Sequence, residues 1–200
     1  MVETQAGLID ILNQSIKLRE RIIQDATWLD AFHHQAGMAI QALQSGHRLF
    51  FAGNGGSMSD AQHITAEFVG RFKLERQSLP AICLGNNPSS ISAIANDYGY
   101  EEVFSRELSG LATKGDIVFG LTTSGNSNNI IKLVEQANHM GITHFIWSGK
   151  DGGQLKHHPH NLIVPSNDTA RIQEIHITLG HGLCQMVDDE FERKKLTNGK

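Results

Sequence analysis

The chain is poor in cysteine and contains no long apolar run. Its 200 residues include two cysteines, Cys83 and Cys184, and no CxxC pair. This usage, together with an N-terminus that lacks the charged, apolar and small regions of a secretory leader, predicts an uncleaved chain in a reducing compartment, the cytoplasm. Apolar runs such as Ile117–Leu121 are far shorter than the about 20 residues that span a bilayer, so a membrane-spanning helix is excluded.

Basic segments are also scarce. The formal net charge is −4, and no run of lysine and arginine is longer than residues 193–195. A broad electrostatic footprint for nucleic acid or anionic lipid is therefore missing. Any recognition of phosphate must come from local dipoles.

The apolar residues that are present follow an α/β pattern. Residues 5–25 and 28–43 carry apolar side chains at helical spacing, which predicts two amphipathic helices before a sheet. Short apolar runs then alternate with helical patterns, as is typical of a parallel sheet covered on both faces. The predicted strands are residues 48–52, 81–84, 117–121, 143–148 and 161–164. The predicted later helices are residues 59–72, stretches between 89 and 112, residues 127–140 and a long final helix over 169–195, whose pattern falters at Gly180 and Gly182.

The length and an apolar content of 40% fit one compact domain. We predict a single domain over residues 1–200, with a helical segment over 1–46 and an α/β core over 47–200. The N-terminal helices need an apolar partner surface and are candidates for contacts between subunits.

Two loops rich in glycine and hydroxyl groups each follow a predicted strand and open onto a predicted helix. Glycine lets the backbone approach an anion, the first N–H groups of a helix carry partial positive charge, and hydroxyls add neutral donors. Either loop alone fits a structural capping role equally well, but two in one small domain favour a phosphate site. The absence of a Walker-type lysine argues against nucleotide hydrolysis. The loops are Gly53-Asn54-Gly55-Gly56-Ser57 and Thr122-Thr123-Ser124-Gly125-Asn126-Ser127.

Histidine and carboxylate side chains suggest acid/base or metal chemistry. His63 and Glu67 are four residues apart, so they share a helix face beside the first loop and could act as a pair or bind one metal ion. Such a pair is also common on helix surfaces, and the neighbouring loop is what favours function. In the final helix, Gln173, His176 and His181 lie in an apolar stretch. Because Gln173 and His181 are about 12 Å apart along a regular helix, both reach one ion only if the first turn is irregular or a neighbouring subunit contributes.

Two further polar groups have a structural interpretation. The segment His157-His158-Pro159-His160 is interpreted as a solvated loop, since no carboxylate or cysteine accompanies it at ligand spacing. Asn96-Asp97 ends an apolar helical stretch and is either a plain cap or a pair at the mouth of a site.

An ordered set of motifs spans nearly the whole chain and closely resembles the phosphoheptose isomerases, which are sedoheptulose 7-phosphate isomerases of the sugar-isomerase (SIS) fold. The combination is far more specific than any single motif. The motifs are Gly-Asn54-Gly-Gly-Ser57, Ala-Gln-His63-x-x-Ala-Glu67, Gly70-Arg71-Phe72, Asn96-Asp97-Tyr-Gly, Thr123-Ser124-Gly-Asn-Ser127, Gly149-Lys-Asp-Gly-Gly153 and Ala-Arg171-Ile-Gln173-Glu-x-His176.

The resemblance implies a single SIS domain of flavodoxin-like type, with a five-stranded parallel sheet, two N-terminal helices and a long C-terminal helix. It also implies a homotetramer with active sites at subunit interfaces. Such an enzyme converts D-sedoheptulose 7-phosphate to D-glycero-D-manno-heptose 7-phosphate in the bacterial cytoplasm, an early step toward the heptose of surface polysaccharides, including lipopolysaccharide. Nucleic acid and membrane are not expected partners.

The resemblance also implies roles for individual residues. Glu67 is the expected base and His181 the expected acid, with one Zn²⁺ per subunit. The expected zinc ligands are His63, Glu67, Gln173 and His181. The expected substrate-binding residues are Asn54, Gly55, Gly56, Ser57, Glu67, Asn96, Asp97, Thr122, Thr123, Ser124, Ser127 and Gln173.

An aldose–ketose isomerase takes a proton from the carbon next to a carbonyl, stabilises the enediolate and returns the proton to the adjacent carbon. Zinc could act there as a Lewis acid. A carboxylate bound to zinc loses basicity, so two alternatives stay open: Glu67 acts as ligand and base at once, or the metal only fixes geometry.

Two alternatives without catalysis share the fold. One is an adaptor of the DnaA-initiator-associating type, with which Ala170-Arg171-Ile-Gln-Glu also agrees, and the other is a sugar-phosphate sensing module. Adaptors are expected to lack the acid/base groups that this chain has at Glu67 and His181, which favours the enzyme.

Overall fold

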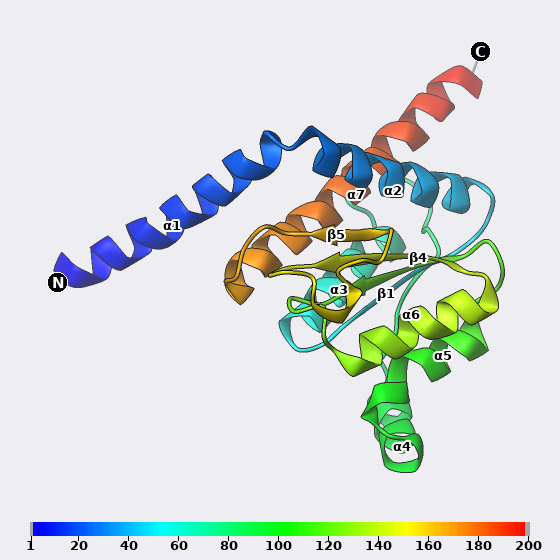
Figure 1. Cartoon of the computed structure of the whole chain (residues 1–200). Helices are drawn as coiled ribbons and strands as arrows, with labels where there is room; N and C mark the ends of the chain where they lie inside the picture. The colour runs from blue at the N-terminus through cyan, green and yellow to red at the C-terminus, as the bar shows by residue number, and fades with distance from the viewer. Residues whose placement is uncertain (1, 199–200) are drawn as a thin grey trace.

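Five parallel strands form the centre of the computed structural model, in the order β2-β1-β3-β4-β5 (Figure 1). This order is the flavodoxin-like one, and it places a topological switch point between β1 and β3. The predicted α/β class and five-stranded parallel sheet are confirmed. The strands are β1 Leu49–Gly53, β2 Ala81–Cys83, β3 Ile117–Leu121, β4 Thr143–Ser148 and β5 Asn161–Ile163.

Helices cover both faces of the sheet, which explains why β1 and β3 are buried along their whole length. Side chains of α2, α3 and α7 pack on one face, and side chains of α5 and α6 pack on the other. The helices are α1 Val2–Ile23, α2 Ala26–Gln44, α3 Gly56–Val69, α4 Pro88–Tyr98, α5 Val103–Leu111, α6 Asn128–Met140 and α7 Thr169–Asn198, with short 3-10 helices η1 Tyr100–Glu102 and η2 Gly153–Leu155.

The structure describes residues 2–198, and the side chains of residues 7–195. The ends of the predicted domain, Met1, Gly199 and Lys200, lie outside the described residues. None of the described helices combines the length and the apolar content that crossing a bilayer requires. Both cysteines are buried and free.

Helix α7 continues through Gly180 and Gly182, where the sequence pattern falters. The glycines serve close packing instead. A Cβ on Gly180 would collide with the side chain of Ile64 on α3, and a Cβ on Gly182 would lie 3.3 Å from the ring of Phe32 on α2. The missing side chains therefore let α7 lie directly against α3 and near α2.

A buried ion pair ties the chain after α3 to α7. The Arg76 Nε donates to Asp188 Oδ1 at 2.8 Å, and both side chains are almost fully buried. Burial alone would raise the pKa of Asp188, but hydrogen bonds from the Leu74 amide, Arg76 and the Lys73 amide lower it below its usual range. Arg76 also donates to the backbone carbonyl of Glu67, so the pair helps to fix the end of α3.

The histidine loop before β5 is less solvated than the sequence suggests. His157 is exposed, but His158 and His160 are half-buried, and His158 Nε2 lies 2.9 Å from Nε2 of His144 on β4. Burial, with smaller contributions from His144 and His160, lowers the pKa of His158 to about 4. The contact of His144 with His158 therefore belongs to the packing at the start of β4 and β5.

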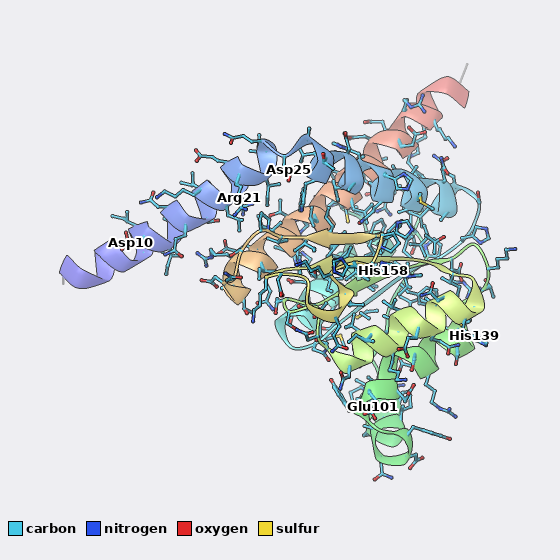
Figure 2. All side chains as sticks on the ribbon, in the orientation of Figure 1. Asp10, Arg21, Asp25, Glu101, His139 and His158 are labelled. Atoms are coloured by element: carbon cyan, nitrogen blue, oxygen red, sulfur yellow. The ribbon has the colours of Figure 1, made fainter. Side chains whose placement is uncertain are left out.

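Two helices project from the domain. In Figure 1, α1 extends far to one side and α4 extends below α5. The inner end of α1 is anchored, since Leu18 and Ile22 are buried and Arg19 donates to Thr178 on α7. Figure 2 shows side chains around the labelled Asp10 standing clear of the domain, although hydrogen bonds from Arg171 to the Ile11 carbonyl and from Ser15 to Glu174 tie this outer part to α7. Exposed apolar side chains on this part are Leu8, Ile9, Ile11, Leu12 and Ile16.

We expect Gly180→Ala to lower the free energy of unfolding by about 1–3 kcal/mol, because the added methyl group overpacks the contact with Ile64. Gly37→Ala is the matched control. Gly37 lies inside α2, and a Cβ there meets nothing within 4 Å, so alanine should raise stability by up to about 1 kcal/mol. Urea denaturation at equal protein concentration measures both, and equal effects of the two variants would contradict the close-packing role.

Candidate active site

The two glycine- and hydroxyl-rich loops lie side by side at the carboxyl ends of neighbouring strands. The first follows β1 and the second follows β3, and the last register pair of these strands is Gly53 with Leu121. Gly55 has a φ of +55°, and a Cβ on Gly53 would collide with the backbone of Ser57. The first loop therefore needs glycine for its tight turn, and both loops flank the switch point of the sheet.

The helices that follow these loops begin without side-chain caps. Asp25 caps α2 and Asn87 caps α4 by accepting backbone N–H groups, but no side chain caps α3 after Gly55 or α6 after Ser127. Amides at an uncapped helix start can bind an anion. The two starts lie together and are the candidate for the anion cradle that the sequence predicts.

Hydroxyl groups line the second loop. Thr122 is buried, and its Oγ1 lies 3.1 Å from Ser127 Oγ and accepts the amide of Gly125 at 3.3 Å. Ser124 Oγ accepts the amide of Asn126 at 3.2 Å. Thr123 is half-buried, as are Ser124 and Ser127. The loop thus holds several hydroxyls at the start of α6, although Thr122 and Ser127 also bind each other.

An amide pair joins the two loops. Asn54 Nδ2 donates to Asn129 Oδ1, and Asn129 Nδ2 donates to Asn54 Oδ1, each at 2.8 Å. Tyr100 of η1 also donates its hydroxyl to Asn54 Oδ1, at 3.2 Å. Sequence reasoning missed Asn129, whose signal is its place two residues after Ser127 in the first turn of a helix that follows a candidate loop.

His63, Glu67 and His181 form one cluster, although they come from two helices. His63 Nε2 lies 3.2 Å from Glu67 Oε1 and 3.3 Å from His181 Nε2, and ligand atoms of the three residues all lie within 4.8 Å of one another. The Phe72 ring stacks on the His181 imidazole at 5.6 Å between centroids. The side chain of His63 is 49% exposed and that of Glu67 is 23% exposed, so the cluster is open to a ligand.

The cluster lies along α3 from the first loop and not directly beside it. His63 follows Gly56 by two helical turns, about 10 Å, and Glu67 follows by three. The sequence interpretation placed the pair beside the loop, but a 14-residue helix carries it toward the opposite end of the strands. A substrate that uses both must be long, with its phosphate far from its reacting atoms.

Gln173 lies at the first loop and not in the cluster. A Cβ on Gly56 would collide with the Gln173 amide, so this side chain covers the start of α3. Helix α7 is regular from Thr169 onward, which removes the irregular first turn as a way to bring Gln173 to His181. Gln173 could join the cluster only from a neighbouring subunit.

The pair Asn96 and Asp97 lies on the exposed end of α4. The Asn96 Nδ2 donates to Asp97 Oδ1 at 2.8 Å, and both side chains are exposed. Gly99 is the C-cap residue of this helix, so Asn96 and Asp97 are not its cap. Tyr100, shortly after them, reaches Asn54 and so links this segment to the loops.

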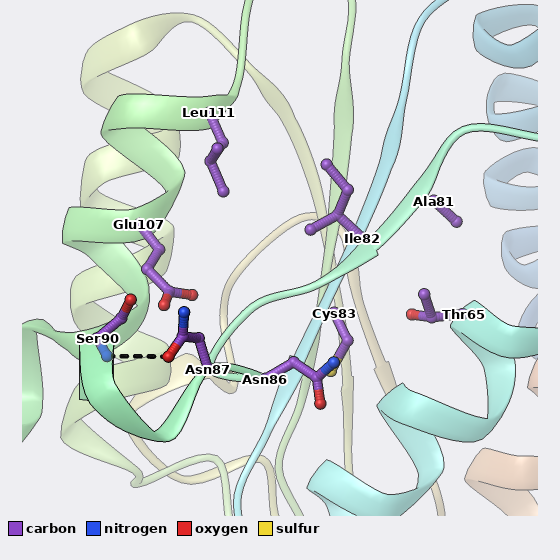
Figure 3. A pocket seen from close by; sticks show the side chains of 9 residues that line it. All are labelled: Thr65, Ala81, Ile82, Cys83, Asn86, Asn87, Ser90, Glu107 and Leu111. Carbon is purple, nitrogen blue, oxygen red and sulfur yellow. Dashed lines mark hydrogen bonds between the residues drawn. The ribbon is translucent and has the colours of Figure 1, made fainter. Parts of the chain in front are cut away.

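A separate cavity of about 540 Å³ lies beside the edge strand β2 (Figure 3). Its lining includes Thr65 of α3, Ile82 of β2 and Glu107 of α5, and none of the predicted site residues. Glu107 accepts the amide of Gly85, and Asn87 caps α4 through Ser90. Its polar groups thus have structural partners.

Asp60 occupies the same face of α3, between Gly56 and His63. Burial raises the pKa of Asp60 to about 6, and His63 offsets part of this. Its Oδ2 is buried and has no hydrogen-bond partner. Sequence reasoning did not single out this residue, because its environment comes from packing.

The donor set of the cluster fits a divalent metal such as zinc. Two imidazole nitrogens and one carboxylate oxygen are ligands that zinc prefers. Ligands at about 2.0–2.1 Å from a tetrahedral ion lie about 3.3 Å apart, which agrees with the separations of 3.2 Å and 3.3 Å around His63.

Comparison with known proteins agrees with this fold. Residues 12–144 match the family model of the SIS domain. The chain is 41% identical over 186 residues to the phosphoheptose isomerase of Clostridium acetobutylicum, covering 92% of this chain and 95% of the relative. It is 48% identical over 155 residues to that of Aquifex aeolicus, covering 77% and 81%.

Solved structures show the same similarity. A phosphoheptose isomerase structure from Francisella tularensis superposes with a TM-score of 0.87 at 30% identity, covering 93% of this chain and 98% of that one. One from Neisseria gonorrhoeae superposes with a TM-score of 0.84 at 34% identity, covering 93% and 99%.

The fold and the family model define a SIS-domain protein. The chain belongs to the phosphoheptose isomerase family. It is therefore an isomerase of sugar phosphates.

We expect Asp60→Asn to raise stability at pH 8 by about 1 kcal/mol, a modest value because partial exposure screens the carboxylate. The folded state binds a proton on Asp60 more readily than the unfolded state does, so the ionised carboxylate costs stability as pH rises from about 4 through about 6. The gain should vanish below pH 4. Thermal unfolding from pH 4 to 8 measures it, with the exposed Asp30→Asn as control, and a gain that does not depend on pH would contradict the assignment.

Proposed function

We propose that this protein interconverts D-sedoheptulose 7-phosphate and D-glycero-D-manno-heptose 7-phosphate through an enediolate. The observation that carries the proposal is the meeting of Glu67 and His181 at His63, in one cluster joined by α3 to an uncapped anion cradle. The relatives are named phosphoheptose isomerases, which supports an enzyme acting on a heptose phosphate.

The separation of cradle and cluster suits this substrate. The phosphate of the sugar is on C7, whereas the reaction takes place at C1 and C2. The amides and hydroxyls after Gly55 and Thr122 would hold the phosphate, and that binding energy would orient the open-chain sugar toward the cluster. Asn54, Gln173, Asn96 and Asp97 are the proposed contacts along the sugar.

Glu67 is the proposed base. Its carboxylate takes a proton from C1 of the ketose, which leaves an enediolate, and the same proton returns to C2. His181 moves the other proton, from O1 to O2, so the product is an isomer of the substrate. Phe72 stacks on His181 and Arg76 holds the backbone at Glu67, and both contacts limit the movement of the reacting groups.

We propose one Zn²⁺ per subunit at His63, Glu67 and His181. The ion would supply positive charge for the oxygens of the enediolate. Gln173 is the proposed fourth ligand, and in this structure it could contribute only from another subunit.

We propose a homotetramer with active sites at subunit interfaces. The exposed apolar side chains of α1, from Leu8 to Ile16, need a partner surface, and a second copy of the chain is the partner that the family suggests. A cytoplasmic location and a role in heptose supply for bacterial surface polysaccharides complete the proposal.

We expect Glu67→Gln to lower kcat for sedoheptulose 7-phosphate by about 10²–10⁴-fold, since loss of the base removes general acid–base catalysis. Substrate should still bind, because the cradle is distant. The exposed Glu75→Gln is the control and should leave kcat unchanged. Aldose formation measures turnover, and substrate-induced thermal protection measures binding.

The same assay separates the enzyme from its alternatives. Near-normal turnover of Glu67→Gln would remove Glu67 as base. Saturable binding without conversion by the unchanged protein would indicate a sensing module, and no binding would indicate an adaptor.

We expect the protein to bind one zinc ion per subunit after chelator treatment and readdition of Zn²⁺. His63→Ala and His181→Ala should each weaken binding by at least about 100-fold, because each removes a ligand. The exposed His33→Ala should bind as the unchanged protein does. Calorimetry and elemental analysis measure the stoichiometry, and unchanged affinity in His181→Ala would contradict the site.

A further inference from the structure

Asn129 lies where the pairing of the two central strands stops. The parallel ladder of β1 and β3 ends at Gly53 and Leu121. Beyond that pair no strand hydrogen bonds hold the first loop at a fixed distance from the second. The next cross-link is the reciprocal amide pair of Asn54 and Asn129, with two hydrogen bonds of 2.8 Å.

The pair joins the two helix starts that form the cradle. The Asn54 carbonyl accepts the amide of Ser57 in the first turn of α3, and Asn129 is the second residue of α6, within the turn that begins at Ser127. Any change in the pair therefore changes the distance between the two sets of uncapped amides.

Burial shields the Asn129 side of the pair from water. Asn129 is 3% exposed, so its amide cannot exchange the bond to Asn54 for one to bulk water. Hydrogen bonds in such surroundings are stronger than in water, and an unpaired amide there is costly. An aspartate at either position would set two oxygens against each other and place a negative charge beside the anion cradle.

We propose that Asn129 is a positioning residue that sets the spacing of the phosphate cradle through Asn54. The inference rests on the proposed function of the cradle, but it concerns a residue that has no assigned role there. Asn129 acts through Asn54 and the two helix starts, and it leaves the chemistry at Glu67 and His181 unchanged.

The test compares Asn129→Ala with Asn128→Ala. Asn128 is exposed and lies one residue earlier on the same helix, so it reports any general effect at this helix start. Asn129→Ala should raise the inorganic phosphate concentration that gives half-maximal thermal protection, the phosphate midpoint, by about tenfold. The KM for sedoheptulose 7-phosphate should rise by a similar factor. A tenfold change corresponds to the loss of one hydrogen bond from the cradle to the charged phosphate. The kcat should stay within about threefold of that of the unchanged protein, since the base and acid are not touched.

A second pair of variants tests the inference if Asn129→Ala folds poorly. Asn129→Asp keeps the side-chain volume, and Asn128→Asp adds the same charge one residue earlier. The first should raise the phosphate midpoint more than the second. In an Asn54→Ala background, Asn129→Ala should add little, because the partner through which it acts is gone.

The outcomes separate this inference from the proposed function. Phosphate binding and KM equal to those of the unchanged protein in a folded Asn129→Ala would overturn the inference and leave the function intact. A shifted phosphate midpoint in a protein that does not convert sedoheptulose 7-phosphate would support the inference and reject the proposed substrate. A loss of kcat without a change in KM, or no protection of the unchanged protein by phosphate, would also overturn it.

Discussion

The direct contact of α3 with α7 is the constraint on which the rest of the site depends. His63 and Glu67 are on α3 and His181 is on α7, so their ligand atoms meet only if the two helices lie unusually close. Gly180 permits this approach at Ile64, and the buried pair of Arg76 and Asp188 holds the end of α3 against the later turns of α7. The packing of apolar side chains and a buried ion pair together place the proposed proton-transfer groups.

A second constraint acts at the carboxyl ends of the strands. Parallel strands deliver both loops to one edge of the sheet, and the starts of α3 and α6 flank the switch point between β1 and β3. Their lack of side-chain caps costs helix stability and leaves amides for a ligand. The amide pair of Asn54 and Asn129 then fixes the spacing that the strand ladder no longer controls.

The two constraints place the phosphate cradle and the His63–Glu67–His181 cluster at different positions along α3. One end of the helix faces the cradle, and the other carries the acid/base cluster, two to three turns away. This separation agrees with a long phosphorylated sugar whose reacting carbons are far from its phosphate. Gln173 stays at the cradle end, so a metal site that includes it needs more than one subunit.

The spacing of apolar residues along the sequence was enough to predict the fold. The alternation of short apolar runs with helical patterns predicted all five strands to within a residue or so at each end. The loops after β1 and β3 were predictable for the same reason, because glycine and hydroxyl residues act locally. The interpretation was wrong where distant contacts decide. The loop at His158 was interpreted as solvated, but His158 contacts His144. The final helix was predicted correctly through Gly180 and Gly182, but no local pattern showed that these glycines serve packing.

The sequence by itself determined the order of strands and helices, the two loops and the residue types that can move protons, because these depend on spacing within one segment. Only the tertiary structure decided that His181 meets His63, that Gln173 does not, and that Asn129 joins the loops. Those contacts join residues far apart in the chain, up to 118 positions for His63 and His181. Their distances follow from how closely whole helices pack, which no local pattern records.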